Sequence, residues 1–591
     1  MSSEKENKIC QNCKKDFTIE SEDFSFYEKI KVPAPTWCPE CRIKRRFVWR
    51  NERNLYKNKC SLCERSIISI YSPDKTYTIY CSECYHGDKW DALSFGQEID
   101  FSKPFLQQFK ELQLKVPRIY NFVFQNHNSE YTNGSAFNKN YYLIFVSDHN
   151  EDCSYSYSLF YSKNSLDCFN SSECELCYGC ISCKKCYKVL FSEDCSNSQD
   201  LFYCKNCTNC HDCVGSVNLR NQQYYIFNVR YSKDEYFQKI KELNLDTREG
   251  LEEVKQESEK LWVKNPTKYM HGFQNVKTIG DYVVNSKNSE FIFDSNLVED
   301  SKFINHGNKL KTCYDGYVVV DGSELSYEIV SAISLNNVKF SYCAWHNFNG
   351  TYMDTCENSD HLFGCVGLRK KQYCILNKQY TKEEYEELVP KIIENMQKMP
   401  YTDSNGKEYY YGEYFAPDLS PFAYNETVAQ EYLPLSQREA ESQGYKWKEP
   451  EIRNYIIEIN PKELPISISA TLEDIIGKVI GCEYKEQCNH QCTLAFKITD
   501  SELQFYQKMN LPLPNKCPNC RHAERFVKHN PLKFWHRTCQ CKGDSSTNDL
   551  YKNTAQHTHG NEVCQNEFET SYSPDRKEII YCEKCYQQEV Y

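Results

Sequence analysis

The chain of 591 residues lacks the long apolar runs and short catalytic signatures from which function is often inferred. It contains no run of about 18 apolar residues, so we expect no membrane span. The stretch MSSEKENKIC has no apolar segment typical of a secretory signal. The motifs GxGxxG, GxxxxGK(S/T), HExxH and GxSxG are missing too. The sequence therefore offers no familiar nucleotide-binding or hydrolase site.

Methionine is also scarce, with 6 residues, and positive charge is in deficit, because the net charge is −11 at pH 7. Overall electrostatics therefore exclude bulk polyanion binding, and any nucleic acid would have to meet a local basic patch. Length excludes a single core and indicates several structural units.

Cysteine, by contrast, is abundant, with 35 residues, an odd number. Many thiols without an export signal indicate a reducing, cytoplasmic location, where paired cysteines more often bind metal than form disulfides. Two Cys-x2-Cys hooks complete one tetrahedral zinc site. The N-terminal hooks predict two such sites, formed by Cys10, Cys13, Cys38, Cys41, Cys60, Cys63, Cys81 and Cys84.

The C-terminus is a second copy of this plan. Cys13, Phe17, Cys38 and Arg42 match residues at one constant offset of 479, and an insertion follows the residue equivalent to Cys60. The candidate ligands of the copy are Cys488, Cys492, Cys517, Cys520, Cys539, Cys541, Cys564, Cys582 and Cys585. Whether Cys541 or Cys564 pairs with Cys539 stays open, as do roles for Cys482, His557 and His559. About four zinc ions per chain are expected.

The stretch CKKDFTIESEDFSFYEKIKVPAPTWCPECR resembles a small treble-clef family described as a zinc-ribbon domain. Its features are the first hook, an aromatic residue, an acidic segment ending in Phe-Tyr, and Cys-Pro-x-Cys-Arg. The match covers about 35 residues at each end, although Cys488 departs in spacing. The whole layout is similar to zinc-ribbon proteins of uncultured bacteria, a resemblance that implies zinc binding and no particular activity.

A basic run with interleaved aromatic residues follows each Cys-Pro-x-Cys hook, where a treble clef opens a helix. Such a surface can bind phosphate and stack bases. The candidate nucleic-acid contacts are Arg42, Arg45, Arg46, Arg50, Arg521 and Arg525. The alternative is that these arginines pack on their own domain or pair with acidic residues elsewhere in the chain.

The middle of the chain is a repeat. Every cysteine from 153 to 213 falls on one three-residue register, whose other positions hold serine, leucine or valine. A longer similarity with a shift of 27 residues overlies it. Neither a helical nor a strand period fits, so we expect a parallel β-helix with short strands, regular corners and small inward side chains.

The densest cysteine run, Cys174 to Cys186, raises the question of a metal cluster. The second array, expected over 265–400, repeats the first, and in it Cys210 matches Ser359 and Cys213 matches Leu362. A cluster ligand cannot become leucine, whereas a packing position can. The run also lacks the ferredoxin spacing. We therefore expect buried thiols there, with a redox iron–sulfur protein as an alternative.

The predicted architecture is mainly β: four-cysteine zinc-ribbon (treble-clef) modules at both termini flank two tandem parallel β-helix arrays, each with a capping helix. Serine or threonine capping boxes at Ser232 and Thr381 mark the starts of those helices. The expected domains are 1–95 and 481–591 as double zinc modules, 96–126 as a helical linker, 127–264 and 265–400 as arrays, and 401–480 as a linker of loops and short helices.

The predicted function is a zinc-binding scaffold without enzymatic activity, whose partner is RNA, DNA or a protein and not a membrane. The sequence does not identify the oligomeric state. The rival prediction is a β-helix enzyme acting on carbohydrate or nucleic acid, in which His346, Asp354 and His361 would line a groove on the second array.

Overall fold

The computed structural model describes the chain apart from residues 1–4, 130, 451–452, 471–472, 486–487 and 489. It divides into two compact units that are each discontinuous in sequence. Unit 1 contains Met1–Asn121 and Met270–Glu449, and unit 2 contains Phe122–Tyr269 and Pro450–Tyr591. Each unit therefore combines the cysteine-rich module of one terminus with the array that is more distant in the sequence.

The first array, in unit 2, is a parallel β-solenoid whose neighbouring coils pair every twelve residues, as Tyr187, Gln199 and His211 do. Its strands are β7 Val123–Phe124, β8 Thr132–Ala136, β9 Ile144–Asp148, β10 Tyr157–Phe160, β11 Phe169–Ser172, β12 Tyr187–Leu190, β13 Gln199–Phe202, β14 His211–Val214, β15 Gln223–Ile226 and β16 Val229–Arg230. Pairing along the array is parallel except between β15 and β16, which form an antiparallel end.

The second array, in unit 1, is one sheet of 11 strands with the same coil length, as in Tyr327 opposite Lys339. Its strands are β18 Gly272–Phe273, β19 Val276–Val284, β20 Lys287–Glu299, β21 Lys302–Lys311, β22 Tyr314–Val320, β23 Tyr327–Ile333, β24 Lys339–Trp345, β25 Thr351–Asp354, β26 Asp360–Val366, β27 Gln372–Ile375 and β28 Lys378–Gln379. It also ends in an antiparallel pair, β27 and β28. The predicted β-solenoid is thus confirmed.

Corners of the coils are made by residues in the left-handed region. From residue 152 to 176 every third residue has a φ near +50°: Asp152, Tyr155, Ser158, Tyr161, Asn164, Asp167, Asn170, Glu173 and Leu176. The residue after each corner points inward and is buried, as Cys153, Ser156 and Leu159 are. Four such triplets complete one coil. Left-handed backbone costs most side chains about 1–2 kcal/mol, so the ladder of parallel strands must offset this cost.

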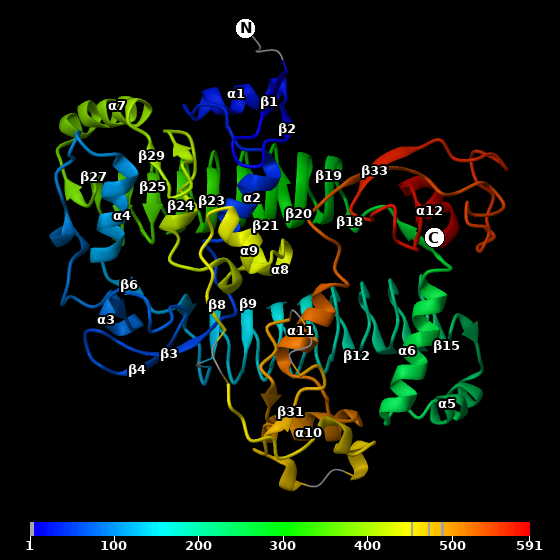
Figure 1. The fold of residues 1–591 in the computed structure, drawn as a ribbon. Coiled ribbons are helices and arrows are strands. Elements are labelled where there is room, and N and C mark those ends of the chain that lie inside the picture. Colours follow the sequence, from blue (N-terminus) through cyan, green and yellow to red (C-terminus); the bar gives the residue numbers. More distant parts are fainter. Residues whose placement is uncertain (1–4, 130, 451–452, 471–472, 486–487, 489) are drawn as a thin grey trace. The chain divides into compact units, whose positions relative to one another are not determined.

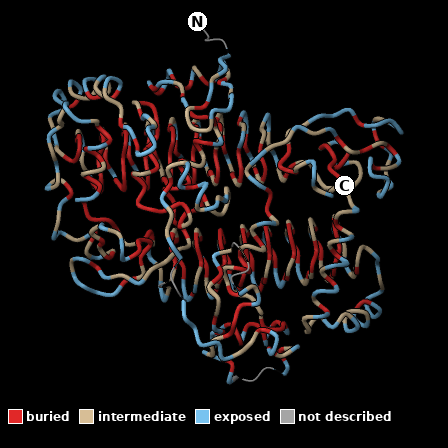
Figure 2. The backbone as a smooth tube through the Cα atoms, viewed as in Figure 1, coloured by how far each residue is buried: buried red, intermediate tan, exposed pale blue. Residues whose placement is uncertain are grey.

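The twelve-residue coil explains the two periods in the sequence. A shift of 27 residues is nine triplets, so it preserves the inward register but moves a residue to the neighbouring face of the coil. Cys174 therefore stacks on Cys186, not on Leu201, and its backbone N–H bonds to Ser162 Oγ one coil earlier. Figure 2 shows the buried residues following the coils of each array.

The terminal modules are built from two-stranded hairpins followed by helices (Figure 1). In unit 1 these are β1 Glu6–Ile9, β2 Asp16–Ile19, α1 Ser21–Lys29, α2 Pro39–Phe47, β3 Tyr56–Lys59, β4 Ser66–Ser69, β5 Ile79–Tyr80 and α3 Ser82–His86. In unit 2 they are β31 Ile480–Gly481, β32 Ala495–Phe496, α10 Asp500–Met509, α11 Pro518–Phe526, β33 Trp535–Thr538, β34 Glu567–Thr570, β35 Ile579–Tyr581 and α12 Glu583–Val590. The same order of elements recurs in both units.

Helices close the arrays where the capping boxes predicted them. Ser232 caps α5 Lys233–Glu242, which α6 Arg248–Trp262 follows, and Thr381 caps α7 Lys382–Lys398. The remaining elements are α4 Phe105–Lys115, β6 Arg118–Ile119, β17 Pro266–Lys268, β29 Tyr401–Thr402, β30 Glu408–Tyr409, α8 Val428–Tyr432 and α9 Gln437–Ser442. No helix among the described residues is long and apolar enough to cross a membrane.

Short parallel strands join each module to its array. β5 of the first module pairs with β6, and β35 of the last pairs with β17. In unit 1, α2 also packs against β22 and β23, and in unit 2, α11 packs against β11 (Figure 1). The structure thus places one cysteine-rich module on each solenoid.

Candidate metal centres

Four cysteine tetrads, two in each unit, bring their sulfur atoms within 4.8 Å of one another. They are Cys10/Cys13/Cys38/Cys41, Cys60/Cys63/Cys81/Cys84, Cys482/Cys492/Cys517/Cys520 and Cys539/Cys564/Cys582/Cys585. All 35 cysteines are free thiols. The eight N-terminal residues predicted as ligands are therefore brought together in the two predicted groups, either of which could hold a metal ion.

The same local fold positions each tetrad. The first cysteine donates its backbone N–H to the carbonyl two residues beyond the second, as Cys10 does to Lys15 at 2.8 Å and Cys60 to Arg65 at 2.9 Å. This bond closes the hairpin and aims both sulfurs to one side. The third cysteine is the N-cap of a short helix, and its N–H points at the sulfur of the first, at 3.2 Å between Cys38 and Cys10.

These repeated bonds identify the equivalent residues in the C-terminal copy. Cys482 bonds to the carbonyl of Leu494, and its sulfur accepts from Cys517 N at 3.3 Å, as Cys10 accepts from Cys38. Cys482 thus takes the place predicted for Cys488. Sequence comparison missed it because the hook between Cys482 and Cys492 is longer. Cys488 lies beside the tetrad, with its sulfur 3.7 Å from that of Cys520.

In the last tetrad Cys564 is the second cysteine, because Cys539 N bonds to the carbonyl of Asn566 at 2.9 Å. Cys539 also accepts from Cys582 N at 3.2 Å. The hook therefore spans the insertion, and Cys541 is left outside this tetrad. Cys541 forms a separate group with His557, His559 and Cys585.

Sulfur separations match the edges of a tetrahedral site. Cys13 and Cys38 are 3.7 Å apart, Cys63 and Cys81 3.8 Å, Cys517 and Cys492 3.9 Å, and Cys564 and Cys582 4.0 Å. A disulfide would require about 2.05 Å. With metal–sulfur bonds of about 2.3 Å, two ligands of a tetrahedral zinc ion lie about 3.8 Å apart.

The thiols of the first array have a different environment. Cys177 Sγ lies 3.5 Å from the carbonyl oxygen of Glu175 and 3.7 Å from that of Cys186, so its proton has a backbone acceptor. Its backbone N–H donates to Ser165 Oγ one coil earlier. Ser165 in turn donates to the carbonyl of Lys163. Cysteine and serine therefore fill equivalent inward positions, which supports packing as the function of these thiols.

The candidate nucleic-acid contacts that belong to unit 1 are buried. Arg42 is 2% exposed and Arg45 is 0% exposed. Arg42 and Arg46 both bond to Asp315 of β22, at 3.0 and 2.8 Å, and Arg46 also reaches Glu328 at 3.0 Å.

A second layer of partners surrounds these pairs. Arg45 bridges Glu328 at 2.9 Å and Glu413 at 2.6 Å. Burial alone would lower the pKa of Arg45, but the charges of Glu328 and Glu413 raise it above its ordinary value. Arg50 bonds to Glu52 and to Ser331.

Unit 2 repeats this arrangement. Arg521 and Arg525 both pair with Asp167, at 3.2 and 2.8 Å, and Lys528 pairs with Glu193 at 2.8 Å. All six candidate arginines thus lie in contacts within their own unit, the alternative that the sequence left open. Their guanidinium groups are not presented to a phosphate in this structure.

Asp354, a residue of the rival enzyme hypothesis, does not line an open groove. Asp354 is fully buried and pairs with Arg118 at 2.6 Å and with Gln113 at 2.7 Å. His361 lies near the surface, 2.8 Å from Asp360, and packs on Tyr373. Asp354 therefore acts as a structural counter-ion for Arg118.

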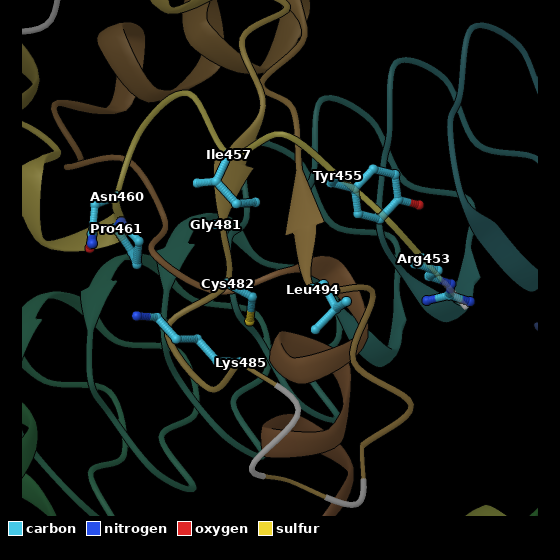
Figure 3. A pocket seen from close by; sticks show the side chains of 9 residues that line it. All are labelled: Arg453, Tyr455, Ile457, Asn460, Pro461, Gly481, Cys482, Lys485 and Leu494. Atoms are coloured by element: carbon cyan, nitrogen blue, oxygen red, sulfur yellow. The ribbon is translucent and has the colours of Figure 1, made fainter. Parts of the chain in front are cut away.

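One hollow of about 380 Å³ lies beside the third tetrad (Figure 3). It is lined by Arg453, Tyr455, Ile457, Asn460, Pro461, Gly481, Cys482, Lys485 and Leu494. In Figure 3, Arg453 and Tyr455 lie on one side of Cys482, and Asn460 and Pro461 on the other. These described lining residues include no carboxylate and no histidine, so they offer no general base of the usual kind.

Comparison with known proteins assigns no family. No family model matches the chain, and no curated protein matches it. A crystal structure described as a candidate acetyltransferase from Desulfovibrio desulfuricans G20 is 12% identical, with coverage of 51% of this chain and 76% of that one. Its TM-score is 0.10, so the similarity carries no argument about fold or function.

Proposed function

We propose that the protein is a zinc-stabilised scaffold in which treble-clef zinc ribbons lock each end of the chain onto a β-solenoid. Zinc suits four thiolates at tetrahedral spacing, and small hairpin–helix modules gain most of their folding free energy from such an ion. The repeated hairpin bond and the helix begun by the third cysteine support the treble-clef assignment.

The observation that carries the proposal is the buried contact between module and solenoid. In both units two arginines, placed one helical turn apart just after the ligands, converge on one aspartate of a solenoid coil. A zinc ion that fixes the helix therefore also fixes the arginines. This arrangement supports a structural function for the metal.

The proposed binding surface for a partner is a row of exposed rings on the first array, away from the buried arginines. Four exposed rings, Phe124, Phe137, His149 and Tyr161, lie on successive coils of the first array. Their centroids are 5.5, 4.8 and 4.7 Å apart in sequence order. The first pair meets edge to face and the other two pairs are stacked. A row of exposed rings on a rigid support can contact the bases of single-stranded RNA or DNA, or the apolar side chains of a protein.

Metal analysis tests the structural part of the proposal. Protein purified without oxygen should contain at least four zinc ions per chain and no iron, and its visible spectrum should be featureless. Chelation should then unfold both sets of modules, as seen by loss of amide protection in α2 and α11. Iron with a charge-transfer absorption band would instead support the iron–sulfur alternative.

Oligonucleotide binding tests the partner. Fluorescence anisotropy with single-stranded RNA and DNA at low salt should show binding that weakens with salt and is lost in a variant carrying Phe137→Ala and Tyr161→Ala. Substitution of the exposed Phe273 in unit 1 is the matched control. Absence of binding at low salt would exclude nucleic acid as the partner of this surface.

A further inference from the structure

The last tetrad is accompanied by a second ligand group, which the long insertion supplies. Only two residues separate Cys60 from Cys63, whereas 24 residues separate Cys539 from Cys564. That insertion carries Cys541, His557 and His559, which converge with Cys585 of α12. Cys585 is thus a member of both groups.

The distances within this group are those of metal ligands. Cys541 Sγ lies 3.5 Å from His557 Nδ1 and 3.4 Å from His559 Nε2, and Cys585 Sγ lies 3.3 Å from His559 Nε2. For bonds of about 2.3 Å to sulfur and 2.0 Å to nitrogen, the sulfur–nitrogen edge of a tetrahedral site is about 3.5 Å.

The other nitrogen of each histidine has the partner that a metal ligand needs. His557 Nε2 faces the buried carboxylate of Glu589 at 3.2 Å, and His559 Nδ1 faces the carbonyl of Glu562 at 2.7 Å. These contacts fix the ring orientations and leave His557 Nδ1 and His559 Nε2 directed at the sulfurs. Asn553 Nδ2 also donates a hydrogen bond to Cys541 Sγ at 3.2 Å, and such bonds often stabilise a metal-bound thiolate.

Glu589 also holds the insertion against α12. Its carboxylate accepts from the hydroxyl of Tyr551, from the backbone N–H of Thr554 and from that of Ala555. The segment QCKGDSSTNDLYKNTAQHTHGNEV contains few apolar residues and cannot form a core of its own. A bound ion would provide the free energy to order it.

We propose that Cys585 bridges two zinc ions, one in the last cysteine tetrad and a second held by Cys541, His557, His559 and Cys585. This inference rests on the proposed zinc-binding function and adds a fifth ion to it. Five thiolates around one divalent ion would leave a charge near −3 in a buried region, and a second ion reduces it to near −1. The equivalent N-terminal tetrad lacks the insertion and would hold a single ion.

Metal content tests the bridge. We expect five zinc ions per wild-type chain. The double variant His557→Asn with His559→Asn should lose one ion, or two ions if both sites that share Cys585 are lost together. His536→Asn, at an exposed histidine paired with Glu567 and Glu569, is the matched control and should retain five. Four ions in both wild type and variant would overturn the bridge and leave the proposed function intact, whereas fewer than four in the wild type would overturn both.

Cadmium-113 nuclear magnetic resonance provides a readout that protein stability alone would not imitate. In the cadmium-loaded chain, two resonances should be coupled to each other through the shared sulfur. The coupling should vanish in the double histidine variant, while resonances of the two N-terminal tetrads stay unchanged. Five uncoupled resonances would overturn the bridging role of Cys585.

Discussion

In both units, equivalent residues hold the cysteine-rich module against its solenoid array. Arg42 and Arg46 meet Asp315, and Arg521 and Arg525, 479 positions later, meet Asp167, 148 positions earlier. Aromatic contacts repeat at the same offsets, give or take one residue in the array. Phe26 and Tyr27 pack on Tyr327, as Phe505 and Tyr506 pack on Tyr178. The chain is therefore duplicated as modules, as arrays and as the contacts between them.

The units differ at two pairs of equivalent positions between module and array. Trp49 packs on Tyr342 in unit 1, and the equivalent positions in unit 2 hold the ion pair of Lys528 with Glu193. Arg45 and Glu328 of unit 1 correspond to Glu524 and Gly179 of unit 2. Both members change in each case, but only the first change keeps a contact between module and array. Glu524 instead accepts from Tyr484 and Lys516 of its own module. At the position of Trp49 and Tyr342, unit 1 should therefore respond less to pH than unit 2 does at Lys528 and Glu193.

The largest effect should come from the shared aspartate. Asp315→Asn leaves Arg42 and Arg46 buried with one charge uncompensated, and loss of a buried partner typically costs about 3–5 kcal/mol. We expect hydrogen exchange of α2 to accelerate while α11 stays protected, and Asp167→Asn should give the reverse pattern. Asp321→Asn, at an exposed corner of the same backbone conformation, is the control. Equal acceleration in α2 and α11 after either change would show that the aspartate does not act on its own unit alone.

A smaller effect is expected from acid. Burial opposes ionisation of Glu193, but Lys205 and Lys528 outweigh it and lower its pKa to about 2 from an ordinary 4.5. Since the folded pKa is lowered, the stabilisation is present above pH 4.5 and is lost as the pH falls toward 2. Glu193→Gln should remove about 1–3 kcal/mol at neutral pH and flatten the acid response of unit 2. A similar flattening in unit 1 would contradict this origin.

The smallest effect should come from the thiols of the solenoid. Cys177→Ser should change the free energy of unfolding by less than about 1 kcal/mol, because serine already occupies the stacked position at Ser165 and donates to the equivalent carbonyl two residues earlier. Zinc content should not change. Cys517→Ser in the third tetrad should remove one zinc ion and expose α11. Zinc lost on Cys177→Ser would give the solenoid thiols a metal site.

Local signals in the sequence predicted much of this structure. Hook spacing identified the first two tetrads, the triplet register identified the solenoid, and capping boxes located α5 and α7. The register could not give the coil length, because any multiple of three keeps the same residues inward. The helical linker predicted for 96–126 contains α4, which begins after Pro104 at its N-cap.

Long-range packing determined the rest. A basic, aromatic helix face looks alike whether it meets phosphate or buried carboxylates, and only the fold decides between them. The equivalent aspartates of the two arrays carried a signal, since each is a charged residue kept at a corner in both copies. Cys482 and Cys564 were obscured by hooks of unusual length, which preserve the hairpin bond but not the spacing.

The exchange of partners between the ends and the arrays has a consequence for synthesis. Arg42 of the first module is synthesised 273 residues before its partner Asp315. The first array likewise emerges long before Arg525, which closes on Tyr155 across 370 residues. Neither unit can finish folding while the chain is still short, and such long loops slow the search for the native pairing. A metal ion bound early by the first cysteine hooks would keep α2 folded until the second array has been synthesised.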